Sequence, residues 1–372
     1  MKKILILTNS MDGFYRFRNE LIIELLKEKY IIYLSAPIDT REDYYRQLGV
    51  NIIHTKISRR SINPFNDLKL FLFYMRLIKI YMPDAVLTYT IKPNVYGGLA
   101  SRFAKIPYIA NITGLGTAIE NKGIIQNIAI KLYKIGLKKA SMIFFQNQEN
   151  LNFMISKGVR GHSYQLLPGS GVNINYFNYL EYPSQDILHF LFIGRVMKSK
   201  GIDYFLESAK YVNEKYPNTV FHVIGDLEED YKDKISDYVS KSFIKYHGKT
   251  DDIRDFLKMS HATIHPSFHE GMSNVLLESA ASGRPVIASN IPGCKETFEE
   301  NKTGLSFIVI NQESLNTAIE KFIKLPYENK KQMGIAGREK MKKEFSRENV
   351  VNKYIEAINK TMEDKKWVYM MI

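Results

Sequence analysis

Short apolar runs alternate with amphipathic segments along the first half of the chain. Ile4–Leu7, Ile31–Ser35 and Ala85–Tyr89 are nearly continuous apolar runs, as found in strands that are buried on both faces. The segments between them, such as Asn19–Lys29, carry apolar residues at helical spacing. This alternation predicts an α/β fold with a parallel sheet covered by helices on both faces.

The pattern is interrupted near Pro168–Gln185, where glycine, asparagine and proline accumulate, and it then restarts. Leu188–Ile193 is expected to be the first strand of a second sheet. We therefore predict two Rossmann-like domains, residues 1–180 and 181–347, with a C-terminal segment of about 348–372 that packs back on the first domain. Neither half carries the G-x-G-x-x-G fingerprint, which disfavours a nicotinamide or flavin cofactor.

The composition fits a two-domain protein of a reducing compartment. The chain has 372 residues, 45% of them hydrophobic, which is ample for two cores. The single cysteine, Cys294, excludes an internal disulfide. The apolar run after Met1 ends too early for a signal peptide, and no stretch approaches the roughly 18 to 20 apolar residues of a membrane span. We expect a soluble, cytoplasmic protein.

The positive charge is confined to the first half. Of the formal net charge of +13, residues 1–184 hold +12, from 24 Lys and Arg against 12 Asp and Glu. Such asymmetry indicates an acidic partner that meets this half only. Because no nucleic-acid-binding motif is found, we expect no nucleic acid and instead an anionic membrane surface, with the protein peripherally associated with the inner face of the cytoplasmic membrane.

Two helical segments are candidates for this membrane contact. Ile124–Lys139 mixes lysines with isoleucines and leucines, and Lys56–Met82 places Arg59 and Arg60 ahead of a Phe- and Leu-rich helix. The alternative is that both helices simply pack against the sheet, which is the more frequent use of such helices.

The candidate ligand site begins with the stretch from His265 to Ala280. Glu270 is expected in a turn and Glu278 about one turn inside the helix that follows. The junction between them consists of Gly271, Met272, Ser273 and Asn274. A helix start behind a glycine suits a phosphate, so Glu278 is expected to bind a ribose diol and Glu270 the hydroxyls beyond the diphosphate. Alternatively, Glu278 is a surface charge and Glu270 an ordinary loop residue.

Two cations complete this predicted site. Arg195 and Lys200 follow the first strand of the second domain, at the edge of the sheet from which the Glu270 loop emerges, and together they can neutralise a diphosphate. Each alone would pass as a surface residue. The chain has no D-x-D pair, so we expect no metal, with the leaving group stabilised by cations and the helix dipole.

Three loops at the carboxyl ends of strands stand out in the first half. Residues 8–18 combine Gly13 with Arg16 and Arg18, which suit bidentate phosphate contacts unless they are solvated residues of a first helical turn. Lys92 lies at a helix entry, again suited to an anion. The third loop leaves its strand through Thr113 and two glycines, which permit close approach by a ligand.

The motifs of the second half resemble the retaining glycosyltransferases of family 4. The resemblance is carried by Gly194-Arg195, Lys200-Gly201, Gly225-Asp226, Pro266-Ser267, Glu270-Gly271, Glu278 and Gly283-Arg284-Pro285, in order and at matching spacing. It implies the GT-B architecture, two Rossmann-like domains facing across a cleft, with a C-terminal helix that crosses back. It also implies a nucleotide-sugar donor, with Arg195 and Lys200 on the diphosphate, Glu278 on the ribose, and Glu270 with the following backbone on the donor sugar.

The first half is similar to bacterial members that extend undecaprenyl-diphosphate-linked sugars, namely N-acetylgalactosaminyltransferases of N-glycan assembly and capsular polysaccharide transferases. The matching motifs are Tyr15 with Phe17-Arg18, Ser61 with Asn63-Pro64-Phe65, Lys92-Pro93-Asn94 and Gly114-Leu115-Gly116. The resemblance implies that Arg18 and Lys92, in the region of Gly13 and Thr113, face the acceptor. Some relatives have an acidic residue or histidine where this chain has Thr113, so no catalytic base is carried over.

The expected activity is transfer of an N-acetylhexosamine or galactose from a UDP-sugar to a lipid-diphosphate-linked acceptor, with retention at the anomeric carbon. Two alternatives stay open: an epimerase of the same architecture acting on UDP-N-acetylglucosamine, and a non-catalytic sugar-nucleotide-binding protein.

Overall fold

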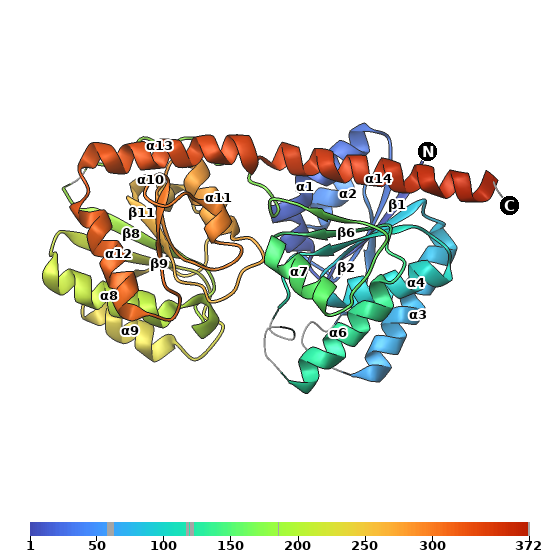
Figure 1. Cartoon of the computed structure of the whole chain (residues 1–372), viewed down its shortest axis with the longest axis horizontal. Coiled ribbons are helices and arrows are strands. Elements are labelled where there is room, and N and C mark those ends of the chain that lie inside the picture. The colour runs from blue at the N-terminus through green and yellow to red at the C-terminus, as the bar shows by residue number, and fades with distance from the viewer. Residues whose placement is uncertain (58–62, 117–118, 120–122, 185, 371–372) are drawn as a thin grey trace. The chain divides into compact units, whose positions relative to one another are not determined.

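The chain forms two compact units. The computed structural model describes residues 1–57, 63–116, 119, 123–184 and 186–370, and Arg59 and Arg60 lie outside them. The first unit comprises Met1–Ser170 with Glu348–Ile372, and the second comprises Gly171–Arg347 (Figure 1). The first unit is therefore assembled from both ends of the chain.

Within the described residues, the first unit contains a sheet of seven strands whose neighbours pair in parallel. In spatial order the strands are β3 (Asn51–His54), β2 (Ile31–Ala36), β1 (Lys3–Leu7), β4 (Ala85–Tyr89), β5 (Tyr108–Ile112), β6 (Met142–Phe145) and β7 (Tyr164–Leu166). The strand order reverses between β1 and β4, which is where open α/β sheets bind ligands.

Helices cover both faces of this sheet. The described elements are α1 (Met11–Lys27), α2 (Glu42–Gln47), α3 (Pro64–Tyr81), the π-helical turn η1 (Pro93–Gly97), α4 (Gly98–Phe103), α6 (Ile124–Leu137), α7 (Gln148–Ser156) and α14 (Arg347–Met370). Along β1, Ile4 and Ile6 pack against α1, α2 and α14, whereas Leu5 and Leu7 pack against α3, α4, α6 and α7. Successive strand residues point to opposite faces, so a continuous apolar run is required here.

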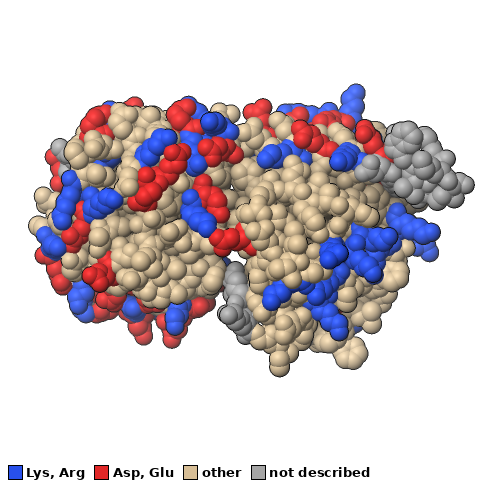
Figure 2. Space-filling model, in the orientation of Figure 1, with Lys and Arg blue, Asp and Glu red and all other residues tan. Residues whose placement is uncertain are grey.

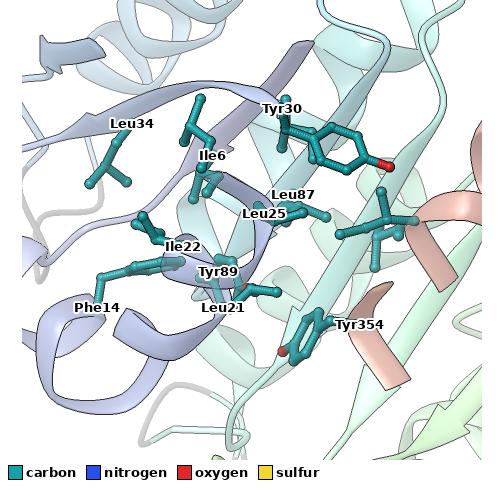
Figure 3. Packing of buried hydrophobic residues seen from close by; sticks show 14 of the residues in the cluster. Ile6, Phe14, Leu21, Ile22, Leu25, Tyr30, Leu34, Leu87, Tyr89 and Tyr354 are labelled. Atoms are coloured by element: carbon teal, nitrogen blue, oxygen red, sulfur yellow. The ribbon is translucent and has the colours of Figure 1, made fainter. Parts of the chain in front are cut away.

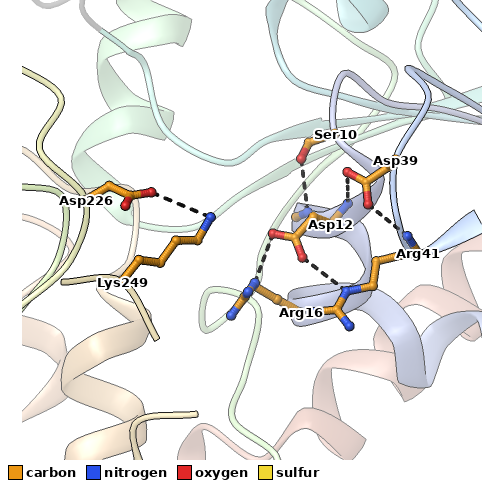
Figure 4. A network of polar contacts seen from close by, with 8 residues as sticks. Ser10, Asp12, Arg16, Asp39, Arg41, Asp226 and Lys249 are labelled. Carbon is orange, nitrogen blue, oxygen red and sulfur yellow. Dashed lines mark hydrogen bonds and ion pairs between the residues drawn. The ribbon is translucent and has the colours of Figure 1, made fainter. Parts of the chain in front are cut away.

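The first helix begins earlier than the sequence pattern indicated. Residues 8–18 were expected to form a loop, but α1 starts at Met11, because the Ser10 hydroxyl accepts a hydrogen bond from the Gly13 N–H at 3.0 Å. Asp12 in the first turn then forms ion pairs with Arg16 at 3.0 Å and with Arg41 at 3.4 Å (Figure 4). The expected loop is thus largely a capped, charge-stabilised helix start.

The last helix completes the core of the first unit, which confirms that it returns to this domain. One face of α14 is buried with α1 and the sheet, formed by Val350, Val351, Tyr354, Ala357, Ile358 and Met362 (Figure 3). The Tyr354 ring lies 4.8 Å from that of Phe144, and its hydroxyl donates a hydrogen bond to the side-chain oxygen of Asn111 at the end of β5. The C-terminal helix therefore fixes a residue next to the Thr113 loop.

The second unit repeats the architecture. Its described strands, in spatial order and pairing in parallel, are β10 (Lys245–Tyr246), β9 (Thr219–Ile224), β8 (Leu188–Ile193), β11 (Ala262–His265), β12 (Val286–Ser289) and β13 (Gly304–Phe307). Its described helices are η2 (Lys198–Lys200), α8 (Ile202–Lys215), α9 (Lys232–Ser240), α10 (Arg254–Met259), α11 (Asn274–Ala281), η3 (Lys295–Thr297), α12 (Gln312–Lys324) and α13 (Tyr327–Glu344). The order reverses between β8 and β11.

A fully buried arginine attaches the first residues of this unit to its sheet. The guanidinium of Arg284 donates to the carbonyl oxygens of Leu257 at 2.7 Å, Leu180 at 2.9 Å and Glu181 at 2.7 Å. Burial lowers its pKa to about 10, so the side chain remains a cation at neutral pH. Arg284 of the Gly-Arg-Pro motif is thus a structural residue.

Four histidines form a row on the second sheet. A ring nitrogen of His222 lies 2.9 Å from a ring nitrogen of His189, and its other ring nitrogen lies 2.9 Å from one of His247. The backbone N–H of His189 donates to the ring of His261 at 3.1 Å. Burial, followed by the neighbouring His189 and His247, lowers the pKa of His222 to about 3. Burial also lowers the pKa of His261 to about 4. The row is therefore neutral at physiological pH.

This row is expected to make the second unit acid-sensitive. Since His222 and His261 titrate near 6.5 when unfolded, the unfolded chain takes up their protons first. The free energy of unfolding should therefore fall once the pH drops below about 6.5, by roughly 2 kcal/mol per buried histidine at pH 5. Urea unfolding at pH 7 and pH 5 measures the loss. His222→Gln should reduce it, and an equal loss in the variant would contradict this origin.

Candidate active site

The loop between β11 and α11, residues 266–273, is held by two neighbouring loops. The Phe268 N–H donates to the Ser199 carbonyl at 3.0 Å, and the Ser273 N–H donates to the Gly293 carbonyl at 2.8 Å. Gly293 has a φ of +82°, and a Cβ there would lie 2.8 Å from the Glu270 carbonyl oxygen. Glycine is required at this position, since both the backbone conformation and the close approach exclude a side chain.

Glu270 is the centre of a buried charge cluster. One carboxylate oxygen, Oε1, accepts from Lys200 Nζ at 2.5 Å and from His265 Nε2 at 2.9 Å. Burial raises the pKa of Glu270, but Lys200 and His265 outweigh this effect and hold the pKa well below its usual range. The side chain of Glu270 is therefore a fixed, ionised carboxylate and not a solvated one.

The start of α11 lies directly after this carboxylate. Ser273 is the N-cap, and its hydroxyl accepts from the Leu276 N–H at 3.4 Å. Gly271 and Asn274 are partly exposed, whereas Met272 is buried against the core. Glu278, also partly exposed, lies four residues after Asn274 and so on the same face of the helix. The positive end of the α11 dipole therefore lies directly after Glu270, with a second carboxylate one turn further on.

The two predicted cations have different partners. Lys200 contacts Glu270, whereas Arg195 is exposed and forms an ion pair with Glu228 at 2.9 Å. The structure thus brings Lys200 and Glu270 together but gives Arg195 a carboxylate of its own. A diphosphate that meets Arg195 would have to replace Glu228, which an exposed pair permits at small cost.

The predicted residues of the first unit are distributed differently. Lys92 forms an ion pair with Asp67 at 2.7 Å, and Asp67 also accepts from the Tyr96 hydroxyl at 2.9 Å. Arg18 is buried, 5.8 Å from the Tyr89 ring and 5.6 Å from the Tyr354 ring, so the alternative of a solvated Arg18 is wrong.

Gly13 and Thr113 lie at two other places in this unit. The Gly13 N–H is already bonded to the α1 cap, and Thr113 follows β5, partly exposed. Among the described residues, the Gly13 N–H donates to Ser10, Arg18 donates to the Phe17 carbonyl and Lys92 to Asp67, so these hydrogen bonds do not join the predicted residues to one another.

Sequence reasoning assigned no role to three residues of these sites: His265, Asp67 and Tyr354. His265 is the last residue of β11, and residues at the carboxyl end of a parallel strand are the usual positions for ligand-binding groups. That rule could have singled it out. Asp67 and Tyr354 lie 25 and 243 residues from their partners, and no sequence pattern indicates those pairs.

Within the described residues, no group of three or more His, Cys, Asp or Glu side chains is arranged to hold a metal ion. The positive charge near Glu270 comes from Lys200, from Arg195 and from the dipole at the start of α11.

Two domain families match the chain. Residues 183–340 match the glycosyl transferases group 1, and residues 3–147 match the glycosyl transferase 4-like domain. The N,N'-diacetylbacillosaminyl-diphospho-undecaprenol alpha-1,3-N-acetylgalactosaminyltransferase of Campylobacter jejuni is 27% identical over 330 residues, covering 84% of this chain and 87% of that protein. The UDP-Gal:alpha-D-GlcNAc-diphosphoundecaprenol alpha-1,3-galactosyltransferase of Escherichia coli is 28% identical over 252 residues, covering 63% and 65%.

The fold is shared with solved structures over the whole chain. The crystal structure of HepE from Anabaena, in complex with UDP and glucose, has a TM-score of 0.80 at 17% identity, covering 97% of this chain and all of that one (100%). Two Rossmann-like units with the last helix returning to the first define the GT-B fold. The chain belongs to the family-4 glycosyltransferases, with a group 1 domain in its second half and a 4-like domain in its first.

Proposed function

We propose that this enzyme transfers a sugar, an N-acetylhexosamine or galactose, from a UDP-sugar to a lipid-diphosphate-linked acceptor in the assembly of a surface polysaccharide or glycan, with retention at the anomeric carbon. The observation that carries the proposal is the ionised Glu270, fixed by Lys200 next to the start of α11. The names of the similar Campylobacter jejuni and Escherichia coli enzymes both describe sugar transfer to an undecaprenol-diphosphate sugar, and the second also names UDP-galactose as the donor.

The second unit is proposed to bind the donor. Lys200 and Arg195 stabilise the diphosphate, together with the positive dipole end of α11 behind Gly271 to Asn274. Glu278 accepts hydrogen bonds from the ribose hydroxyls, and Glu270 from those of the sugar. In the transfer, the bond from the anomeric carbon to the phosphate oxygen breaks, the acceptor oxygen bonds that carbon on the same face, and the leaving phosphate takes the acceptor proton. No metal is required in this proposal, because cations and the helix dipole stabilise the leaving charge.

The first unit is proposed to bind the acceptor, with Lys92, Gly13 and Thr113 at the carboxyl ends of its strands. Lys92 would exchange Asp67 for an acceptor phosphate. Arg18 is buried under Tyr354 and would act from behind this surface, by holding Tyr89 at the end of β4.

The decisive experiment supplies four UDP-sugars, the galactose, glucose, N-acetylgalactosamine and N-acetylglucosamine forms, with and without an undecaprenyl-diphosphate sugar. Release of UDP only when the acceptor is present, with a retained anomer seen by NMR and equal rates in EDTA, is the expected result. Interconversion of the UDP-sugars without acceptor would instead identify an epimerase. Binding without any product would identify a non-catalytic protein.

The first unit also presents a surface suited to an anionic membrane. No helix in the described part of the chain has the length and apolar character of a membrane span. One face of α6 is buried in the core, whereas Ile124, Ile125 and Ile128 are exposed, beside exposed Lys131. Figure 2 shows Lys and Arg side chains gathered over this part of the first unit, with little acidic charge among them. Packing explains only the buried face, so we propose peripheral membrane association through the other.

Vesicle sedimentation tests this membrane contact. The enzyme should bind vesicles that contain phosphatidylglycerol, and much less those of phosphatidylcholine alone, with binding weakened by salt. Replacing Ile125 and Ile128 together with glutamate should reduce binding about tenfold or more. Ile308→Glu, at an exposed isoleucine of the second unit, is the matched control. Equal binding by both variants would place the contact elsewhere.

A further inference from the structure

His265 occupies a position from which it can control Glu270. It is the last residue of β11, and its side chain is only 4% exposed. Its Nε2 lies 2.9 Å from Glu270 Oε1 and 3.1 Å from the hydroxyl of Ser273, the cap of α11. Because Glu270 is a carboxylate, Nε2 must carry the proton and donate it. The ring therefore links the carboxylate to the strand end and to the helix start.

The two oxygens of Glu270 are used unequally. Lys200 and His265 both donate to Oε1, and the described residues offer no donor to Oε2. The Glu270 side chain is 13% exposed. Oε2, which has no donor in the described part of the chain, is not buried. Oε2 is therefore the solvent-facing oxygen and the one that a ligand hydroxyl can reach.

Lys200 alone would not fix this orientation. An ammonium group on a flexible four-carbon chain can follow either carboxylate oxygen, whereas the imidazole of a buried histidine at a strand end has one position. A second donor on the same oxygen removes the rotation that would exchange Oε1 and Oε2. The Nδ1 of His265 is buried without a hydrogen-bond partner, a cost that a merely structural side chain of similar shape would avoid.

We infer that His265 is a positioning residue for the donor sugar: it holds Oε1 of Glu270 so that Oε2 accepts a sugar hydroxyl. The inference rests on the proposed function, since it requires that Glu270 meets the sugar and not the nucleotide. Its consequence is specific. Loss of the imidazole should weaken the sugar-dependent part of donor binding and leave the affinity for UDP unchanged.

Three variants test this geometry. His265→Leu keeps the approximate volume and removes the donor. The amide nitrogen of His265→Gln can occupy the position of Nε2, whereas that of His265→Asn lies near the position of Nδ1. Calorimetric titration with UDP and with the four UDP-sugars gives the ratio of the two affinities, and circular dichroism checks folding.

The expected result is that the leucine and asparagine variants bind UDP normally but lose about tenfold or more of the preference for the active UDP-sugar over UDP, with a similar fall in kcat. The glutamine variant should recover most of both. In a Glu270→Gln background, His265→Leu should have no further effect on this ratio, because the residue acts through Glu270.

The inference fails if the glutamine and asparagine variants behave alike, if UDP affinity falls in parallel with UDP-sugar affinity, or if the two substitutions are additive. These outcomes leave the proposed function intact, since the wild-type enzyme would still transfer the sugar. If the wild-type enzyme shows no acceptor-dependent release of UDP from any of the four sugars, the proposed function itself fails, and this inference with it.

Discussion

Replacing Glu270 with glutamine is expected to lower the transfer rate about a thousandfold. The substitution keeps the size of the side chain but removes the charge that Lys200 and His265 share at Oε1. Lys200 is then left as a largely buried cation without its carboxylate, and the oxygen offered to the sugar loses most of its acceptor strength. Steady-state kinetics with the active UDP-sugar and the lipid acceptor measure the effect.

Two other glutamates of the second unit make this result interpretable. Glu320→Gln removes a surface partner of Lys215 and should leave the rate unchanged. Glu278→Ala should raise the Kd for UDP about tenfold, with a smaller change in kcat, because it removes contacts to the nucleotide. Full activity of both the Glu270 and the Glu278 variants would exclude this site as the centre of transfer.

Replacing Arg284 with methionine should destabilise the second unit by about 3–5 kcal/mol. The guanidinium donates to carbonyl oxygens of Leu180, Glu181 and Leu257, and each carbonyl left without a donor in the interior costs roughly 1–3 kcal/mol. Methionine fills part of the space but offers no donor. Urea unfolding followed by circular dichroism measures the change.

The matched control is Arg254→Met, in the same unit. The Arg254 side chain is 40% exposed, bonds Asp252 two residues earlier and lies over the Tyr176 ring, so its loss should cost much less stability than that of Arg284. An Arg284 variant that unfolds at the same urea concentration as this control would show that the carbonyl oxygens find other donors, and would contradict a structural role for the Gly-Arg-Pro motif.

The sequence pattern predicted the α/β architecture because buried parallel strands require continuous apolar runs, as in β1 and β8. Shorter elements were missed. The helix α7, with the sequence QENLNFMIS, has a single fully buried residue, Met154, so its apolar periodicity is weak. The strand β13 has only four residues and is recognised as a strand by its pairing with β12, which a linear pattern does not contain.

For the candidate site, the sequence pattern placed its loops after the same strands as the structure does, but it did not indicate the side-chain partners. Lys200 and Glu270 could be expected near one another because both follow neighbouring parallel strands. Arg195 pairs with Glu228, 33 residues away, and Lys92 pairs with Asp67, 25 residues away. Nothing in these spacings indicates an ion pair. Side-chain pairing depends on register and packing, which a linear pattern does not specify.

The path of the last helix has a consequence for biosynthesis. The buried core of the first unit includes one face of α14, between Val350 and Met362, which follows the second unit in the sequence, whereas the second unit is continuous from Gly171 to Arg347. A ribosome that has released residues up to 347 has supplied everything that the second unit needs, while the first still lacks one helix of the layer formed by α1, α2 and α14. We therefore expect the unit encoded later to finish folding earlier, and the N-terminal half to depend on protection of its exposed apolar face until residues 350–362 have been synthesised.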